Sequence, residues 1–301
     1  MNKILISVIG PTAIGKTKLA IKIAEHYNTE IVSADSRQFF KEMCIGTAVP
    51  SQEELESVTH HFIQHKSILE PYSVGDFEKD AIKLLTALFK KHDIVVMVGG
   101  SGLYVDAVSY GFDEFPEVDP KIRMELNTLY NDKGIEPLQA KLKELDEKYY
   151  ATVAIENPQR LVRALEICIG SGKPYSSFLN KKDIQRMFKT VTIGITADRE
   201  LIYDNINKRV TVMKEAGLLE EAKSLLAHKH LNALQTVGYK ELFKYFDGEW
   251  TLDFALSEIK KNTRRFAKRQ LTWFRKNENT LWFNHDYKIE NVLRQIEKII
   301  N

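Results

Sequence analysis

The residues whose spacing most clearly predicts chemistry lie near the beginning of the chain, in VIGPTAIGKT at positions 8–17. They match the phosphate-loop pattern G-x-x-x-x-G-K-[ST]. Glycines let backbone N–H groups turn toward an anion, and the following helix adds the positive end of its dipole. Lys16 can neutralise phosphate oxygens, and the Thr17 hydroxyl can bind Mg²⁺. The predicted phosphate-binding residues are Gly10, Pro11, Thr12, Ala13, Ile14, Gly15, Lys16 and Thr17.

Such a loop needs a buried strand before it and a helix after it. The apolar run KILISVI at 3–9 supplies the strand, and a helix is expected from Lys16 to Tyr27. Further strands are expected in TEIVSAD, ending at Asp35, in DIVVMVGG, ending at Gly99, in VTIGITAD (191–198) and in TLWF near 280. The first three place polar or glycine residues at their carboxyl ends, where open α/β sheets bind ligands. The fold class is therefore α/β, with a P-loop NTPase-like parallel sheet.

The pattern of residue types changes between about Phe112 and Met187, where charged residues and helical periodicity replace the apolar runs of buried strands. Asn157-Pro158 starts a predicted helix that stops near Gly170 to Gly172. From Arg199 to Arg275 the chain is expected to be mostly helical. We predict a core in two parts, 1–112 and 189–301, the second with a basic C-terminal helix, and a helical insert at 113–188.

The composition is that of a folded protein, with 301 residues, 44% hydrophobic, 28% charged and a formal net charge of +2. Two cysteines, Cys44 and Cys168, suggest neither a disulfide framework nor a zinc site. No apolar run approaches the ~18 residues of a membrane span, and the N-terminal segment is too short for a signal peptide. We expect a cytoplasmic enzyme without a membrane partner. With so small a net charge, a nucleic-acid surface requires local clustering of basic residues.

Six motifs, in order over nearly the whole chain, resemble those of the tRNA dimethylallyltransferase family, also called tRNA isopentenyltransferases. They are GPTAIGKT (10–17), DSRQ (35–38), IGTAVP (45–50), HH (60–61), GGSGLY (99–104) and AKRQLTW (267–273). The resemblance implies transfer of a dimethylallyl group from dimethylallyl diphosphate, held with Mg²⁺ on the phosphate loop and Thr17. The acceptor is N6 of the adenosine 3′-adjacent to the anticodon in tRNA, and diphosphate is released.

The resemblance also implies residue roles. Asp35 is the general base for N6, Ser101 replaces the usual Thr between donor and tRNA, and Lys16 stabilises the leaving diphosphate. The implied tRNA contacts to the anticodon stem-loop, partly from a mobile insert, are Asp35, Ser36, Arg37, Gln38, Ser101, Arg123, Gln159, Arg160, Leu161, Val162, Arg163, Gly238, Tyr239, Lys240, Arg264, Lys268, Arg269 and Arg275. Reaching N6 requires the base to flip out of its stack.

A helical projection of residues 260–276 supports RNA binding, because this segment has no acidic residue. The expected basic side contains Lys261, Arg264, Arg265, Lys268, Arg269 and Arg275. The expected apolar side contains Phe266, Ala267, Leu271, Trp273 and Phe274.

Other interpretations stay open from the residues alone. The loop also suits a P-loop nucleotide kinase or phosphotransferase, the acceptor could be a free adenine nucleotide, and a non-catalytic RNA-binding protein could keep a relict loop. Asp35 could merely cap a turn, and Gln38 either reads an adenine edge or lies in a solvated turn. His60-His61 is expected to be a structural loop, because adjacent side chains rarely converge on one metal ion. We expect a monomer.

Overall fold

The computed structural model describes residues 3–179 and 184–300. The chain divides into two compact units, one formed by Met1–Tyr110 with Arg186–Asn301 and the other by Gly111–Gln185. We call them the core unit and the helical unit. These divisions fall within a few residues of the expected insert at 113–188.

The core unit contains a six-stranded sheet of order β3-β2-β4-β1-β5-β6 in which every pairing is parallel. This arrangement confirms the predicted fold class. The strands are β1 (Ile4–Ile9), β2 (Ile31–Ser33), β3 (His60–His61), β4 (Ile94–Val98), β5 (Lys189–Thr196) and β6 (Leu281–Asn284).

The expectation that His60-His61 forms a loop was wrong, because both residues pair with β2 as an edge strand. Nε2 of His61 lies 2.7 Å from a carboxylate oxygen of Glu30, one residue before β2. The pair therefore has the structural role that was expected, but in the sheet. The described residues contain no group of three or more His, Cys, Asp or Glu side chains that could hold a metal ion.

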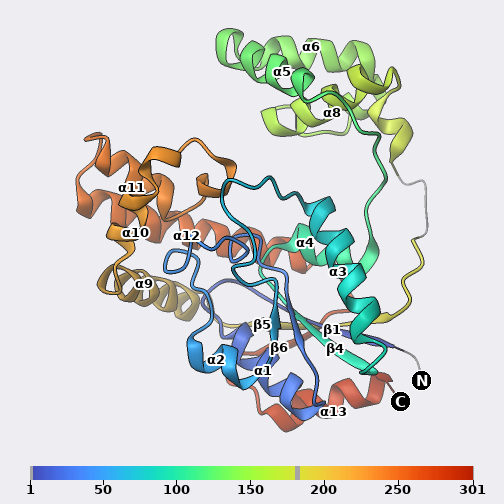
Figure 1. Ribbon diagram of the computed structural model, residues 1–301, viewed down its shortest axis with the longest axis vertical. Coiled ribbons are helices and arrows are strands. Elements are labelled where there is room, and N and C mark those ends of the chain that lie inside the picture. Colours follow the sequence, from blue (N-terminus) through green and yellow to red (C-terminus); the bar gives the residue numbers. More distant parts are fainter. Residues whose placement is uncertain (1–2, 180–183, 301) are drawn as a thin grey trace. The chain divides into compact units, whose positions relative to one another are not determined.

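Residues of the central strands alternate between two apolar cores, as the two-residue period of a strand requires. Ile4, Ile6 and Val8 of β1 enter one core, which α1 (Lys16–His26) and α13 (Ile289–Ile300) cover. Leu5 and Ile9 enter the other, which α3 (Val74–Leu88) and α4 (Gly102–Tyr110) cover. Figure 1 shows these helix pairs on opposite faces of the sheet.

The remaining part of the core unit is helical, as predicted for residues 199–275. Its helices are α9 (Arg199–Glu215), α10 (Leu218–Ser224), α11 (Tyr239–Phe246) and α12 (Leu252–Phe274), and α2 (Gln52–Ser57) precedes β3. Residue Thr251 caps α12 by accepting a hydrogen bond from the backbone N–H of Phe254. Helix α12 packs against α9 and α11, so that one long helix connects several parts of the site.

The helical unit is built from α5 (Pro120–Lys133), α6 (Glu136–Leu145), α7 (Glu147–Tyr150) and α8 (Pro158–Ser171). Figure 1 shows α5, α6 and α8 side by side. Asn157 caps α8, and Gly172 ends it in the left-handed conformation at φ 68°, as its sequence predicts. The unit has its own apolar core, with Leu126, Leu138 and Leu165 fully or almost fully buried.

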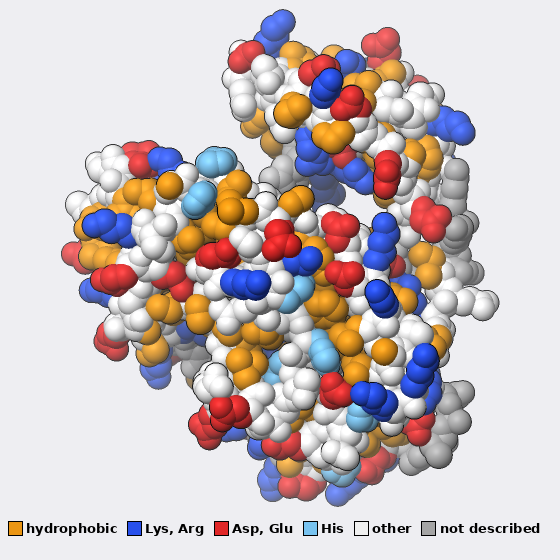
Figure 2. All heavy atoms as spheres, viewed as in Figure 1, with side chains coloured by type: hydrophobic (Ala, Val, Ile, Leu, Met, Phe, Trp, Pro, Cys, Tyr) orange, Lys and Arg blue, Asp and Glu red, His pale blue; other side chains and the backbone are white. Residues whose placement is uncertain are grey.

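Among the helices of residues 3–179 and 184–300, none combines the length and apolarity needed to cross a membrane. On the face drawn in Figure 2, basic and acidic side chains are interspersed rather than separated, in keeping with the small net charge.

Candidate active site

The phosphate loop connects β1 to α1, and its backbone depends on two glycines. Gly15 immediately precedes α1 with φ 93°, in the left-handed region that favours glycine. Gly10 has φ 149°, and a Cβ there would lie 2.6 Å from the carbonyl oxygen of Ile195. The loop can therefore direct amides at the N-terminus of α1 toward an anion.

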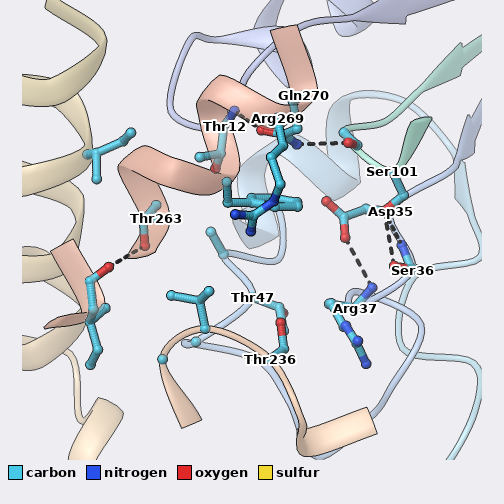
Figure 3. Close-up of a pocket in the computed structure, with 18 of the residues that line it drawn as sticks. Thr12, Asp35, Ser36, Arg37, Thr47, Ser101, Thr236, Thr263, Arg269 and Gln270 are labelled. Atoms are coloured by element: carbon cyan, nitrogen blue, oxygen red, sulfur yellow. Dashed lines mark hydrogen bonds between the residues drawn. The ribbon is translucent and has the colours of Figure 1, made fainter. Parts of the chain in front are cut away.

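The candidate base and hydroxyl lie at the same sheet edge as the loop. Strands β2, β4 and β1 are neighbours, so the residues after their carboxyl ends meet. Asp35 follows β2, and its carboxylate accepts a hydrogen bond of 3.1 Å from the Arg37 N–H. Ser101 precedes α4, and its Oγ accepts a 3.1 Å hydrogen bond from the Ser36 N–H. Figure 3 shows the Asp35 carboxylate directed toward the middle of a cavity. Asp35 therefore caps its turn through the Arg37 N–H and also faces this cavity.

Gln270 on α12 ties these segments together. Its Oε1 accepts a 2.9 Å hydrogen bond from the Thr12 N–H, and its Nε2 donates a 2.8 Å bond to the Gly100 carbonyl (Figure 3). A Cβ at Gly100 would lie 2.5 Å from that same Nε2. Gln270 is only 5% exposed, so it fixes the spacing between the phosphate loop and the turn after β4.

Two cations accompany the loop. Lys16 Nζ donates to the Pro11 carbonyl at 2.8 Å, and Arg209 on α9 donates to the Thr12 hydroxyl at 3.2 Å. Burial lowers the pKa of Lys16 to about 8; the carboxylate of Asp35 acts against this shift, and the positive charge of Arg209 adds to it. Asp35, Lys16 and Arg209 thus act on one another electrostatically. A bound diphosphate would relieve the repulsion between the two cations.

Asp35 and Arg209 line a cavity of about 580 Å³ within the core unit, and Thr12 is the phosphate-loop residue in that lining. Its polar wall includes Thr12, Asp35, Ser101 and Arg209, and its apolar wall comes mainly from α4, α9 and α12. The apolar lining residues include Leu103, Ile206, Met213, Val237, Phe266 and Trp273. A carboxylate, a guanidinium and an apolar wall in one cavity next to the phosphate loop suit a reaction between a phosphorylated apolar group and an aromatic base.

Comparison with known proteins accords with this chemistry. Residues 38–277 match the family model described as IPP transferase, and this range covers more than half of the chain. The chain belongs to the IPP transferase family. It is 62% identical over 301 residues to the tRNA dimethylallyltransferase of Christiangramia forsetii, covering all of both chains. It is 60% identical to that of Flavobacterium johnsoniae, covering 98% of this chain and 97% of the relative.

Solved structures of the family have the same fold. The full-length tRNA isopentenylpyrophosphate transferase of Bacillus halodurans is 38% identical, with a TM-score of 0.72 over 100% of this chain and 96% of that one. A eukaryotic dimethylallyltransferase captured acting on tRNA has a TM-score of 0.78 over 94% of this chain and 74% of that one. At 24% identity, the second likeness concerns the fold alone.

For this member of the IPP transferase family, the structure brings only some of the predicted residues to the cavity. Those that line it are Thr12, Asp35, Ser36, Arg37, Ser101, Gly238, Lys240 and Arg269. Of the predicted basic side of α12, Arg269 alone is in that lining. Arg264 instead donates to Asn207 at 2.9 Å. Lys268 on α12 and Arg275, directly after it, are exposed.

Three of the predicted tRNA-contacting side chains are buried. Tyr239 is 0% exposed, and its hydroxyl donates to Glu221 at 2.7 Å. Leu161 and Val162 belong to the apolar core of the helical unit. For these residues the expectation of a side-chain contact with RNA was wrong, because the helix faces that carry them pack inward. Gln159 and Arg160, on the same helix as Leu161, are exposed.

Arg37 and Gln38 have structural roles. Arg37 Nη1 donates to the carbonyls of Asn232 and Ala233 at 3.0 and 2.9 Å. The Gln38 amide nitrogen donates to the carbonyls of Thr47 and Ala48 at 3.2 and 2.8 Å. A bidentate contact with an adenine edge needs this same amide N–H₂. The expected adenine-reading role of Gln38 therefore conflicts with its bonds in this structure.

The helical projection placed Phe266 on the apolar side of the helix, but Phe266 is not buried. It is 37% exposed and lines the cavity, where the Arg269 guanidinium lies 5.8 Å from its ring centroid. The buried direction of α12 is set instead by Ala267, Gln270 and Phe274. An exposed aromatic ring beside an arginine offers a surface on which a base could stack.

Two of the predicted arginines of the helical unit, Arg123 and Arg163, form one cluster. Glu166 is 3% exposed, and its carboxylate binds both Arg163 on the same helix and Arg123 on α5. The ion pairs hold both guanidinium groups, and the side chains of Arg123 and Arg163 are 53% and 42% exposed. Their contact with tRNA stays a prediction.

Sequence reasoning did not single out Arg209 or Gln270. Gln270 is part of the AKRQLTW motif, which could have indicated it, whereas Arg209 follows Lys208 in an ordinary amphipathic helix. Residues 235–237, directly before the predicted Gly238, also line the cavity.

Glu221 on α10 holds the IGTAVP segment beside the cavity. Its carboxylate accepts hydrogen bonds of 2.7–2.9 Å from the N–H groups of Cys44, Ile45 and Gly46. Replacing Glu221 with alanine leaves these donors without their acceptor. We expect the free energy of unfolding to fall by about 1.5–3 kcal/mol, measured by urea denaturation. Glu220→Ala, on the same helix, serves as the control, and equal stability of the two variants would contradict this role.

Proposed function

We propose that this protein transfers a dimethylallyl group from dimethylallyl diphosphate to N6 of the adenosine 3′-adjacent to the anticodon in tRNA. The observation that supports this most directly is one cavity that holds the Asp35 carboxylate and the Arg209 guanidinium and is bordered by Thr12 of the phosphate loop, the loop that also carries Lys16. Membership of the IPP transferase family and the tRNA dimethylallyltransferase names of its relatives support the same transfer.

In the proposed reaction, the N6 lone pair forms a bond to C1 of the dimethylallyl group while the C1–O bond breaks. The electron pair of that bond leaves with diphosphate, and the N6 proton passes to the Asp35 carboxylate. An aromatic amine is weakly basic, but its proton becomes acidic as the new bond forms, so a carboxylate at the right distance suffices. The Arg37 N–H holds the orientation of Asp35.

The developing charge on the leaving diphosphate is stabilised by Lys16, Arg209 and the amides at the start of α1. The residues also suit Mg²⁺, because Thr17 directly follows Lys16 in the first turn of α1, and a hydroxyl at this position of a phosphate loop is a typical Mg²⁺ ligand. The described residues offer no carboxylate cage, and Mg²⁺ commonly takes most of its ligands from substrate phosphates and water. Bound there, Mg²⁺ would add charge neutralisation on the diphosphate.

Two anticodon stem-loop RNAs that differ only in the base 3′ of the anticodon, adenosine or guanosine, test this proposal. After incubation with dimethylallyl diphosphate and Mg²⁺, mass spectrometry of the digested RNA is expected to find one added dimethylallyl group in the adenosine substrate only. Modification of the guanosine RNA, or of adenosines elsewhere in the loop, would contradict the proposed acceptor. Transfer to free AMP but to neither RNA would show that the acceptor is a free adenine nucleotide and not tRNA.

The lowered pKa of Lys16 gives a pH dependence for donor use. Diphosphate binds the protonated amine, so kcat/KM for dimethylallyl diphosphate is expected to fall as pH rises through about 8. Initial rates at limiting donor between pH 6.5 and 9.5 would measure this. In Lys16→Arg, whose guanidinium stays protonated, the alkaline fall should disappear, even if the overall rate is lower. If kcat/KM of that variant still falls at alkaline pH as in the wild type, the fall must come from the titration of another group.

A further inference from the structure

A second cavity, of about 550 Å³, lies in the core unit beside the first. Its apolar lining includes Ile9, Val105 and Phe274. Its polar lining comprises Asp106, Ser109, Tyr110, Thr192, Lys276, Asn277 and Asn279. Of all the residues that line the two cavities, Trp273 on α12 is shared by both. The indole of Trp273 therefore forms part of the wall that separates them.

This wall is held in place from both sides. Trp273 Nε1 donates to the Asp106 carboxylate at 2.7 Å, and α4 carries Asp106. Gly102, also on α4, allows the close approach, because a Cβ there would lie 2.4 Å from the Trp273 ring. Lys276 Nζ lies 5.3 Å from the centroid of the same ring. A large ring fixed by a partly buried hydrogen bond and a glycine contact keeps one position.

The reacting groups lie against the same turn. Gly102 follows Ser101, and Gly100 contacts Gln270, which binds the phosphate loop. A donor whose diphosphate occupies the loop and whose C1 faces Asp35 has its apolar chain near this turn. The chain can extend until it meets the indole, and beyond the indole lies the second cavity.

We propose that Trp273 is a specificity-determining residue that limits the prenyl donor to five carbons. This inference rests on the proposed prenyl transfer. The bond changes are the same for a longer donor, with N6 attacking C1 and diphosphate leaving. A ten-carbon chain would need the volume that the indole occupies. Removing the indole joins the two cavities and provides space for the additional isoprene unit.

The test compares dimethylallyl and geranyl diphosphate as donors for wild type, Trp273→Ala and Trp273→Phe, with an anticodon stem-loop RNA as acceptor. We expect the ratio of geranyl to dimethylallyl transfer to rise about tenfold or more in Trp273→Ala, since single methylene differences in an apolar pocket already change rates by about that factor. Trp273→Phe keeps most of the wall and should stay close to wild type. Adding Val105→Phe to Trp273→Ala fills the second cavity and should restore the preference for five carbons.

Calorimetric binding of geranyl and dimethylallyl diphosphate to each variant gives a readout that does not need turnover. Relative affinity for the geranyl donor should rise in Trp273→Ala and fall again in the double variant. A ratio unchanged from wild type in binding would overturn the proposal, and so would a Val105→Phe change without effect. If wild type transfers neither donor to RNA, the proposed function fails; if it transfers the five-carbon donor and the ratio does not respond, only the role of Trp273 fails.

Discussion

Replacing Asp35 with asparagine is expected to lower kcat for prenyl transfer by about 10²–10⁴-fold, the usual contribution of a positioned general base. The side-chain oxygen of asparagine can still accept the Arg37 N–H, so the turn after β2 is preserved. What is lost is the group that takes the N6 proton. The affinity for the donor is expected to change little, because the loop, Lys16 and Arg209 remain in place. Single-turnover rates with saturating donor and RNA measure the chemical step directly.

Asp204→Asn is the matched control, since Asp204 is an exposed carboxylate on α9 that does not line the cavity. It should retain the wild-type rate. A kcat for Asp35→Asn within a few-fold of wild type would show that Asp35 only caps its turn, which is the structural role it also has.

Replacing Arg209 with glutamine is expected to lower kcat by about 10²–10³-fold, the effect typical of removing one donor to a developing oxyanion. Arg209 lines the cavity and binds the phosphate loop through Thr12. Its loss should also weaken donor binding, because the diphosphate keeps only one of its two side-chain cations. Lys208→Gln makes the same charge change at the exposed neighbouring position of α9 and should stay near wild type.

The pKa of Lys16 provides a second measurement of the role of Arg209. The positive charge of Arg209 contributes to the lowered pKa of Lys16. In Arg209→Gln the pKa of Lys16 should therefore rise, and the alkaline fall in kcat/KM should move to higher pH. A reduced rate with an unshifted alkaline limb would mean that the two cations do not share the anion site.

The parts of the site that sequence reasoning located are those encoded locally. The phosphate loop occupies eight consecutive positions, and Asp35 and Ser101 each follow a recognisable buried strand. Because parallel strands end at one sheet edge, their convergence could be expected once the strands were assigned. The same holds for α8, whose Asn157 cap and Gly172 ending are both visible in the sequence.

The residues that were missed or misplaced depend on packing between distant segments. Nothing near Arg209 distinguishes it from Lys208 until α9 packs against the phosphate loop. Tyr239 is buried because α11 packs it into the apolar core, where Glu221 on α10 accepts its hydroxyl hydrogen. Phe266 was assigned to the apolar side of α12 by its angle alone, yet the cavity lies on that part of the helix. The strand at His60-His61 is only two residues long and polar, so no periodicity indicates it.

The central claim is that the phosphate loop holds a prenyl diphosphate rather than a nucleotide. The most direct measurement is transfer of label from isotopically labelled dimethylallyl diphosphate, with Mg²⁺, to unmodified tRNA or to AMP, beside a parallel assay of ATP hydrolysis in the presence of tRNA. We expect label in tRNA, little in AMP and no ATP hydrolysis. Hydrolysis of ATP without transfer of label would contradict this claim and assign the loop to a nucleotide phosphotransferase.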